Sequence, residues 1–293
     1  MNAFGIIANY RKPDLWAFLP VLVDWLLERG CTVAITDRLV GSSYQPPEKV
    51  KVHSTATIIR HVDVMLSIGG DGTILSTARI VGKAKVPILG IHMGGLGFLA
   101  EVPIADTFKA LEQVLDGNHY LEERMVLAVD LQHGSKLETY YAVNDLVVDR
   151  GSSPRLLHAK VEVSGRKLND YVADGLIVAT PTGSTAYSLA AGGPIVVPSL
   201  EVLTITPICP HSLSARPIVV PSTDKIVIRF KESQEGIALT LDGQVKFEID
   251  NQAVVTTRRA TWNINMVRLP SSDYYQVLRT KMGWSGEARG VRS

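Results

Sequence analysis

The sequence predicts two domains, an α/β domain followed by a mainly β domain. In the first part of the chain, short apolar runs alternate with helical patterns, an order typical of βαβ units on a parallel sheet. After Gly117 the pattern changes to many short runs rich in valine, isoleucine and threonine. With 293 residues, 46% of them hydrophobic, the chain is long enough for each domain to bury its own core.

The first domain is expected over residues 1–118 as a Rossmann-like α/β unit. Its elements are expected, in chain order, as strand 4–8, helix 14–28, strand 32–36, strand 62–68, strand 87–91 and helix 104–115. Asp14 suits the N-cap of the first helix, and Gly30 suits the position after its end. Pro20 lies inside this pattern, so the helix is expected to kink or split there.

The second domain is expected over residues 119–270 as a β-sandwich. Turn signals separate its strands, namely His133-Gly134-Ser135, Ser164-Gly165 and Asp242-Gly243. One helix is expected from Ser184 to Ala191, because that stretch lacks β character and stops at two glycines. A capped helix over 271–284, ending at Gly283, is expected to pack back on the first domain.

Charge and cysteine content exclude several classes of protein. Thirty Lys and Arg against 29 Asp and Glu leave a net charge of +1, so no broad field gathers nucleic acid or an anionic membrane. Cys31 and Cys209 lie far apart and fit neither a disulfide framework nor a zinc spacing. No apolar run reaches the roughly 18 residues of a membrane span. These features favour a soluble cytoplasmic protein.

A glycine-rich acidic loop, Gly69-Gly70-Asp71-Gly72-Thr73, follows the strand that ends at Ile68, and a helical pattern resumes at Ile74. Glycines at such a junction let backbone N–H groups approach a polyphosphate, and the start of the helix adds a favourable dipole. A carboxylate beside phosphates is repelled unless it binds a metal or accepts a proton, so Asp71 is a candidate general base. The structural alternative is a tight turn in which Asp71 only caps the helix.

A second glycine loop spans residues 90–99 and also follows a strand. Ligands of open α/β sheets collect at the carboxyl ends of the strands, so the two loops are expected to line one crevice. His92, in this loop, is as consistent with packing or hydrogen bonding as with ligand binding.

Polar residues interrupt the strand patterns of the second domain. Asn144-Asp145 sits in an apolar run and Asp174 opens another, and such carboxylates suit ribose hydroxyls if they do not simply face water. The stretch from Thr180 to Ser188 supplies hydroxyls that could hold a phosphate or an amide, while Tyr187 could stack on a flat ring or lie in the core. Ser184 lacks the flanking pattern of a hydrolase nucleophile, and no histidine has the spacing of a metal cluster.

Taken in order, these motifs resemble the series found in the NAD kinases (ATP-NAD kinases), over nearly the whole chain. The motifs are 69–73, 96–99, 144–145, 174–188, 192–194, 211–217 and 242–244. The first is shared with phosphofructokinases and lipid kinases, whereas the run from Asp174 to Pro194 resembles only the NAD kinases. Two alternatives stay open, a lipid kinase that shares the first loop and a non-catalytic NADP-binding sensor.

The resemblance implies transfer of a phosphoryl group from ATP to the 2′-hydroxyl of the adenosine ribose of NAD. Asp71 is then the proton acceptor, and Gly69, Gly70, Gly72 and Thr73 form the phosphate loop. NAD is expected to contact Asp71, Gly72, Phe98, Asn144, Asp145, Arg155, Asp174, Thr182, Thr185, Ala186, Tyr187, Ser188, Leu189, Ala190 and Gln244. Mg²⁺ or another divalent cation is expected to arrive with ATP rather than at a fixed protein site, and the chain is expected to form a homodimer or homotetramer.

Three departures from the family pattern stand in this sequence. Asp145 replaces the usual glutamate, and its shorter arm would reach a ribose through a water or a small shift. His92 and Gly95 occupy positions where polar residues are commoner, and Val172 lies where the family varies with acceptance of NADH.

Overall fold

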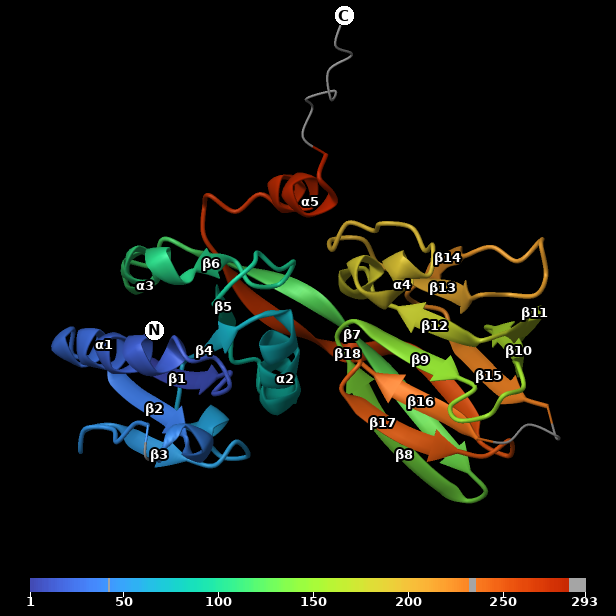
Figure 1. Ribbon diagram of the computed structural model, residues 1–293, viewed down its shortest axis with the longest axis horizontal. Coiled ribbons are helices and arrows are strands. Elements are labelled where there is room, and N and C mark those ends of the chain that lie inside the picture. Colours follow the sequence, from blue (N-terminus) through green and yellow to red (C-terminus); the bar gives the residue numbers. More distant parts are fainter. Residues whose placement is uncertain (42, 232–235, 285–293) are drawn as a thin grey trace, which may run out of the picture. The chain divides into compact units, whose positions relative to one another are not determined.

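The computed structural model describes residues 1–41, 43–231 and 236–284, in two compact units. The first unit contains Met1–Glu122 and the segment from Ile264 onward, and the second contains Glu123–Asn263. The expected combination of an α/β domain and a mainly antiparallel β-sandwich is confirmed (Figure 1). No helix among the described residues combines the length and the apolar character needed to cross a membrane.

A parallel sheet forms the centre of the first unit, in the order β5-β4-β1-β2-β3, with β6 beside β5. Its strands are β1 (Ala3–Ala8), β2 (Thr32–Thr36), β3 (Lys51–His53), β4 (Val64–Gly69), β5 (Ile88–His92) and β6 (Val102–Pro103). Its helices are α1 (Leu15–Glu28), α2 (Asp71–Val81), α3 (Thr107–Leu115) and α5 (Tyr274–Met282), with 3-10 turns η1 (Asp37–Leu39), η2 (Ile58–Arg60), η3 (Gly82–Ala84) and η4 (Ile104–Asp106).

Side-chain alternation along β1 and β4 divides this sheet into two packed faces. Phe4, Ile6, Leu66 and neighbouring residues pack with α1 and α3 in one apolar core. Ser67 points to the other face, where its hydroxyl accepts a hydrogen bond from Thr77 of α2 at 2.9 Å. Helices therefore cover both faces, as Figure 1 shows, and the carboxyl ends of the strands remain uncovered for a site.

Helix α1 is not split at Pro20, so that part of its prediction is wrong. The helix runs unbroken from Leu15 to Glu28, because burial of Leu19, Leu22 and Leu26 outweighs the hydrogen bond that Pro20 cannot donate. Asp14 occupies the N-cap position, but its side chain makes no capping hydrogen bond.

Two antiparallel layers make up the second unit. One layer has the order β14-β13-β12-β9-β16-β17, and the other contains β11-β10-β15-β18 together with β7 and β8. The strands are β7 (Tyr120–His133), β8 (Lys136–Ala142), β9 (Asp145–Asp149), β10 (Leu157–Val163), β11 (Arg166–Ala173), β12 (Gly175–Ala179), β13 (Val202–Ile208), β14 (Ile218–Pro221), β15 (Ile226–Phe230), β16 (Ile237–Leu241), β17 (Val245–Ile249) and β18 (Val254–Arg268). Both layers contribute to one apolar core.

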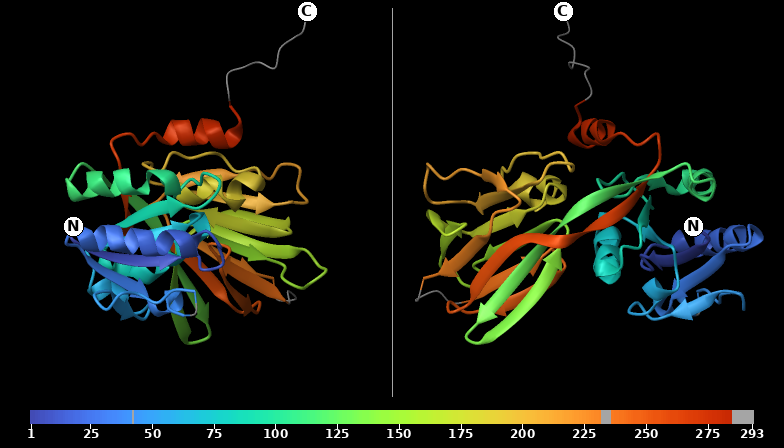
Figure 2. Two further views of the ribbon diagram at one scale, coloured as in Figure 1. Left: turned by 60° about the vertical axis from the view of Figure 1, so that its left-hand side comes forward. Right: turned by 180° about the vertical axis from the view of Figure 1, so that it is seen from behind.

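Strands β7 and β18 lie side by side, and each passes from one unit into the other (Figure 2). The end of β18, from Ile264 onward, belongs to the first unit, where Met266 pairs in parallel with Ile88 of β5. Helix α5 follows, with the Asp273 side chain accepting a hydrogen bond from the Tyr275 N–H at 2.8 Å and Gly283 in the left-handed conformation.

The helix expected from Ser184 to Ala191 is wrong in its bounds. A 3-10 turn, η5 (Thr182–Thr185), precedes a four-residue helix, α4 (Tyr187–Ala190). The Ser184 hydroxyl, which is fully buried, donates to the Pro181 carbonyl at 2.7 Å, so this segment forms a compact turn before α4 begins.

Candidate functional site

Asp71 lies in the first turn of α2 and reaches across to the second glycine loop. Its Oδ2 accepts a hydrogen bond from the Phe98 N–H at 2.8 Å, and its Oδ1 accepts from the N–H groups of Leu99 at 3.1 Å and Ala100 at 3.2 Å. The carboxylate therefore fastens the two loops together and does not cap α2, whose N-cap is Gly70. No second donor among the described residues bonds Oδ2, so one of its lone pairs remains available to a ligand hydroxyl.

Gly97 is required for this arrangement. A methyl group at position 97 would overlap the Asp71 carboxylate. A methyl group at Gly69 would likewise overlap the Thr73 hydroxyl, which accepts from the Gly70 N–H. These two glycines serve close packing around a polar side chain.

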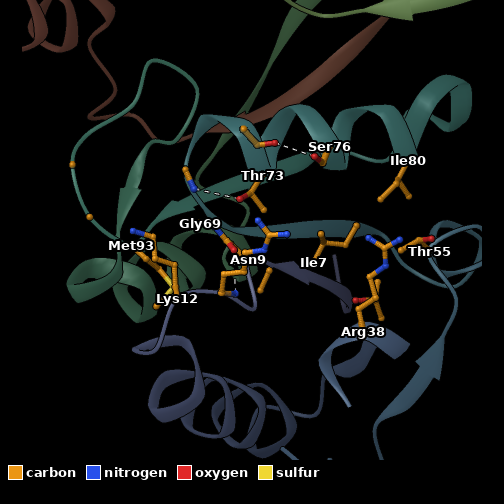
Figure 3. A pocket seen from close by; sticks show the side chains of 17 residues that line it. Ile7, Asn9, Lys12, Arg38, Thr55, Gly69, Thr73, Ser76, Ile80 and Met93 are labelled. Atoms are coloured by element: carbon orange, nitrogen blue, oxygen red, sulfur yellow. Dashed lines mark hydrogen bonds between the residues drawn. The ribbon is translucent and has the colours of Figure 1, made fainter. Parts of the chain in front are cut away.

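A cavity of about 490 Å³ opens at the carboxyl ends of the strands of the first unit (Figure 3). Both glycine loops line it, as the sequence predicts. Its lining includes Ile7, Ala8, Asn9, Arg11, Lys12, Thr36, Arg38, Thr55, Gly69, Gly70, Gly72, Thr73, Ser76, Ile80, Met93, Gly94 and Gly95. Three of these side chains are cationic and none is acidic, a lining that suits an anionic ligand.

The three cations enter the cavity from two strand ends. Asn9 follows β1, and its side chain and carbonyl accept from the N–H groups of Arg11 and Lys12 at 3.1 and 3.0 Å, so this turn fixes the start of both basic side chains. Figure 3 shows Lys12 beside Met93, with Arg38 farther along the cavity beside Thr55. Backbone N–H groups of the glycine loop and side-chain cations thus face one space, the arrangement that a polyphosphate requires.

In the second unit, Asp145 lies at the start of β9 with only 3% of its surface exposed. The Asp242 carboxylate accepts hydrogen bonds from the N–H groups of Val143, Asn144 and Asp145 at 3.1, 2.7 and 3.3 Å. Asp242 itself adopts a left-handed conformation in the turn after β16. This carboxylate holds the Asn144-Asp145 segment in place.

Burial, and then the nearby Asp242 charge, raise the pKa of Asp145 from 3.8 to about 7. The alternative in which Asp145 faces water is therefore wrong. Asn144 Oδ1 is also buried and has no hydrogen-bond partner among the described residues. A buried carboxyl group with a raised pKa and a buried amide oxygen without a partner thus occur at consecutive positions, which suits a segment that binds a polar ligand.

The segment from Thr180 to Ser188 packs directly on Asn144. The Thr180 hydroxyl donates to the Val143 carbonyl at 2.6 Å, and a methyl group at Gly183 would overlap the Asn144 backbone. Ser188 is fully buried, with its hydroxyl 3.0 Å from the Thr206 hydroxyl. Tyr187 is 48% exposed, so the alternative that places it in the core is wrong.

The remaining expected ligands differ in exposure. Thr182 is buried, Thr185, Ala186 and Leu189 are half-buried, and Ala190 is exposed. Asp174 directly precedes β12, and its Oδ1 lies 3.0 Å from Nε of Arg150 in an ion pair. Arg155 and Gln244 are exposed in the β9–β10 and β16–β17 connections.

Residues that could hold a metal are sparse. Within the described part of the chain, no three His, Cys, Asp or Glu side chains gather at one point. The cavity offers the hydroxyls of Thr73 and Ser76 and backbone oxygens, a donor set that suits Mg²⁺ carried largely by phosphate oxygens. His92 contacts the Gly94 carbonyl through Nδ1 at 2.9 Å, which fits the hydrogen-bonding interpretation.

Sequence reasoning missed the basic residues of the cavity, Arg11, Lys12 and Arg38. A signal was present, because Arg11-Lys12 comes just after the first apolar strand, where ligands of parallel sheets bind. Arg38 carries no comparable signal, since only the sheet order brings the end of β2 to the same cavity.

Family models and relatives agree on the identity of the chain. The model of the ATP-NAD kinase N-terminal domain matches residues 4–120, and that of the ATP-NAD kinase C-terminal domain matches residues 143–269. The NAD kinase of Geotalea daltonii is 41% identical over 288 residues, and that of Geobacter metallireducens is 45% identical over 288 residues. Each alignment covers 97% of this chain and 99% of the relative.

Solved structures agree as well. Yeast NADH kinase complexed with NADH superposes with a TM-score of 0.90 at 26% identity, over 99% of this chain and 89% of that one. An NAD kinase from Archaeoglobus fulgidus in complex with ATP gives a TM-score of 0.71 at 22% identity, over 96% of this chain and 97% of that one, and shows the fold alone. The chain belongs to the ATP-NAD kinase family, whose members are phosphotransferases acting on NAD.

Proposed function

We propose that this chain transfers the terminal phosphoryl group of ATP to the 2′-hydroxyl of the adenosine ribose of NAD, giving NADP. The observation that carries the proposal is the Asp71 carboxylate, fixed by three backbone N–H groups within a glycine loop that lines a cationic cavity. A base that is held rigidly beside a phosphate site is what phosphoryl transfer to a hydroxyl requires.

The reaction assigns distinct tasks to these groups. The hydroxyl oxygen attacks the terminal phosphorus in line, the bond from phosphorus to the bridging oxygen breaks, and ADP leaves with that oxygen. The hydroxyl proton passes to the open lone pair of Asp71 Oδ2 as the new bond forms. Arg11 and Lys12 would neutralise the charge on the donor phosphates, and the N–H groups of the phosphate loop, Gly69, Gly70, Gly72 and Thr73, would orient them.

Mg²⁺ or another divalent cation supplies further charge neutralisation when it arrives with ATP. In the cavity, the hydroxyls of Thr73 and Ser76 are the side chains that would face it. Among the described residues, no carboxylate lines the cavity, which supports a cation held mainly by the phosphate oxygens of ATP.

The NAD acceptor is assigned to the polar residues of the second unit, together with Asp71, Gly72 and Phe98. Asp145 in its charged form would accept two ribose hydroxyl protons, and the unpartnered Asn144 Oδ1 would accept another hydrogen bond. Exposed Tyr187 offers a ring face for stacking on a base or nicotinamide. Asp174 would engage the ligand while it remains paired with Arg150.

The wider setting proposed is a cytoplasmic homodimer or homotetramer that needs neither nucleic acid nor a membrane. The net charge of +1 supports the absence of a nucleic-acid or membrane partner, because it gives no broad electrostatic field that would attract either one. Light scattering on a sizing column would measure the subunit number.

The test mixes the protein with ATP, Mg²⁺ and NAD and follows NADP with an NADP-specific dehydrogenase, with NADH and a diacylglycerol in parallel wells. NADP is expected from the wild type, and Asp71→Asn is expected to lose about 10²-fold or more in kcat. Circular dichroism checks that the variant is folded. A folded wild type that phosphorylates neither NAD nor NADH would refute the proposed activity, and near-normal turnover by Asp71→Asn would refute the role of the base.

A further inference from the structure

A buried charge network lies next to the loop that holds Asp71. The side chain of Arg268, at the end of β18, is 8% exposed, and that of Glu101 is 12% exposed. Arg268 Nη1 lies 2.7 Å from Glu101 Oε2, and Arg268 Nε lies 2.6 Å from Glu122 Oε2. One guanidinium therefore bridges two carboxylates from separate parts of the first unit.

This network is bonded to the backbone of the same loop. Arg268 Nη1 also donates to the Leu99 carbonyl at 3.3 Å, while the Leu99 N–H donates to Asp71 Oδ1. Glu101 directly follows Ala100, whose N–H is another donor to Asp71. The peptide groups that hold the carboxylate are thus held from the opposite side by Arg268 and Glu101.

The C-terminal helix provides further contacts to this segment. Glu101 Oε1 accepts hydrogen bonds from the Leu269 N–H at 3.0 Å and from the Ser272 hydroxyl just before α5. Within α5, Leu278 is buried, and Lys281 Nζ lies 5.9 Å from the centre of the Phe98 ring, within range of a cation–π contact. The loop is therefore enclosed between Asp71 and the C-terminal segment.

A purely stabilising role is the competing interpretation. Buried ion pairs are weak evidence for stability, because desolvation offsets most of their attraction. What the planar fork of an arginine adds is a fixed direction, since it can bond two carboxylates and a carbonyl at once. Two of the three acceptors, the Leu99 carbonyl and the Glu101 carboxylate, belong to the segment whose peptide groups contact Asp71, and the third is Glu122 of β7.

We propose that Arg268 and Glu101 are positioning residues that hold the Phe98–Ala100 backbone, and through it the Asp71 carboxylate, in the geometry needed for proton acceptance. This inference rests on the proposed role of Asp71 as base. It assigns a function in the active site to the C-terminal segment, which lies almost 200 residues away in the sequence.

The test variant is Arg268→Lys, which keeps the charge but cannot bond Glu101, Glu122 and Leu99 together. Arg268→Met would leave two carboxylates without their buried partner and is expected to unfold the chain. Ser272→Ala is a second and milder variant that removes one bond to Glu101. The matched control is Arg29→Lys, the same substitution at an ion pair between the residue that follows α1 and Glu112 of α3, 3.2 Å apart.

Two readouts are measured for each variant. Hydrogen exchange measures how fast the amides of Phe98, Leu99 and Ala100 exchange, whether or not the protein is active. Steady-state kinetics separates an effect on kcat from an effect on KM. Arg268→Lys is expected to speed exchange at these amides and to lower kcat about tenfold or more at unchanged KM for ATP and NAD. Ser272→Ala is expected to change the exchange rate and kcat in the same directions but by smaller amounts. Arg29→Lys is expected to change neither the exchange rate nor kcat.

A double-mutant cycle decides whether Arg268 acts through Asp71. In an Asp71→Asn background, Arg268→Lys is expected to change the residual kcat by less than about twofold. Unchanged exchange at the three amides, a kcat loss that multiplies with that of Asp71→Asn, or an effect confined to KM would each overturn the inference. If the wild type makes no NADP, the kinase proposal fails by itself, and the exchange arm still decides whether Arg268 holds the loop.

Discussion

At the scale of single residues, Asp145 and Asp242 show how the fold sets the charge of a proposed binding group. The backbone N–H groups satisfy Asp242, whereas Asp145 is buried beside it and its pKa is raised to about 7. Near neutral pH, ligand-free molecules therefore carry Asp145 in both its protonated and its charged form. A ligand whose hydroxyls donate to the Asp145 carboxylate therefore binds the charged form of the protein in preference to the protonated form.

This shift predicts a pH-dependent stability. Between pH 4 and 7 the folded state keeps a proton on Asp145 that the unfolded chain releases, so this residue lowers the free energy of unfolding as the pH rises across that range, and the loss levels off above pH 7. Asp145→Asn should remove that loss, which amounts to a few kcal/mol. Thermal melts without ligand are expected to show the variant gaining on the wild type between pH 5 and pH 8.

Asp170→Asn, at an exposed carboxylate of the same unit, serves as the control for general charge effects. Its melting temperature is expected to follow that of the wild type across the same range. A difference between Asp145→Asn and the wild type that stays constant from pH 5 to pH 8 would contradict the assignment.

Gly97 gives a second prediction at this scale. Because an added methyl group would overlap the Asp71 carboxylate, Gly97→Ala should displace this proposed base and lower kcat by roughly 10- to 100-fold, while the cores remain intact. Gly41→Ala is the control, since a methyl group there meets no atom within 4 Å. Initial rates and a melting curve would check it, and a kcat close to that of the wild type would show that the carboxylate can move without loss.

At the scale of elements, the β1–α1 connection is the part of the cavity that supplies most of its charge. Arg11 and Lys12 both lie in this connection, in a turn set by Asn9. Lys12→Ala should raise the KM for ATP about tenfold, because it removes one charge-assisted hydrogen bond to the phosphates. The KM for NAD should stay unchanged. Lys49→Ala removes an exposed lysine of the same unit that does not line the cavity.

The kinetic measurement should be repeated at two salt concentrations. Screening weakens attraction between partly exposed charges, so the defect of Lys12→Ala is expected to shrink as salt rises. An ATP KM equal to that of the wild type at low salt would remove Lys12 from the donor site.

Sequence patterns predicted elements well where burial is periodic and poorly where the chain turns on itself. The strands around Ile6, Ile35, Leu66 and Leu89 lie where the apolar runs predict them. The effect of Pro20 on α1 was overestimated, because the helix propensity of single residues does not include the apolar area that α1 buries. The η5–α4 segment was misread because contacts with Asn144 and Val143, distant in sequence, decide its shape.

At the scale of the whole molecule, the class of both units followed from the change of periodicity near Gly117, but the path of the last strand did not. Met266 pairs with Ile88 of the first sheet, and no periodicity specifies a partner almost 180 residues away. The contact of Asp71 with Phe98, Leu99 and Ala100 is unpredictable for the same reason. The loop pattern and the family resemblance both predicted Asp71 as the base, and only the structure supplies the groups that hold it.

The division of the chain into two units predicts separate footprints for the two substrates. The cationic cavity lies wholly in the first unit, so a non-hydrolysable ATP analogue with Mg²⁺ should slow amide exchange in the β1–α1 connection and over residues 69–76. NAD should slow exchange over residues 143–145 and 180–188, where the buried Asp145 and the unpartnered Asn144 Oδ1 lie. Each ligand is expected to protect these segments when it is added alone, because the groups proposed for ATP are already held within the first unit and most of those proposed for NAD within the second. Protection of residues 143–145 by the ATP analogue, with none over residues 69–76, would reverse the assignment of donor and acceptor sites.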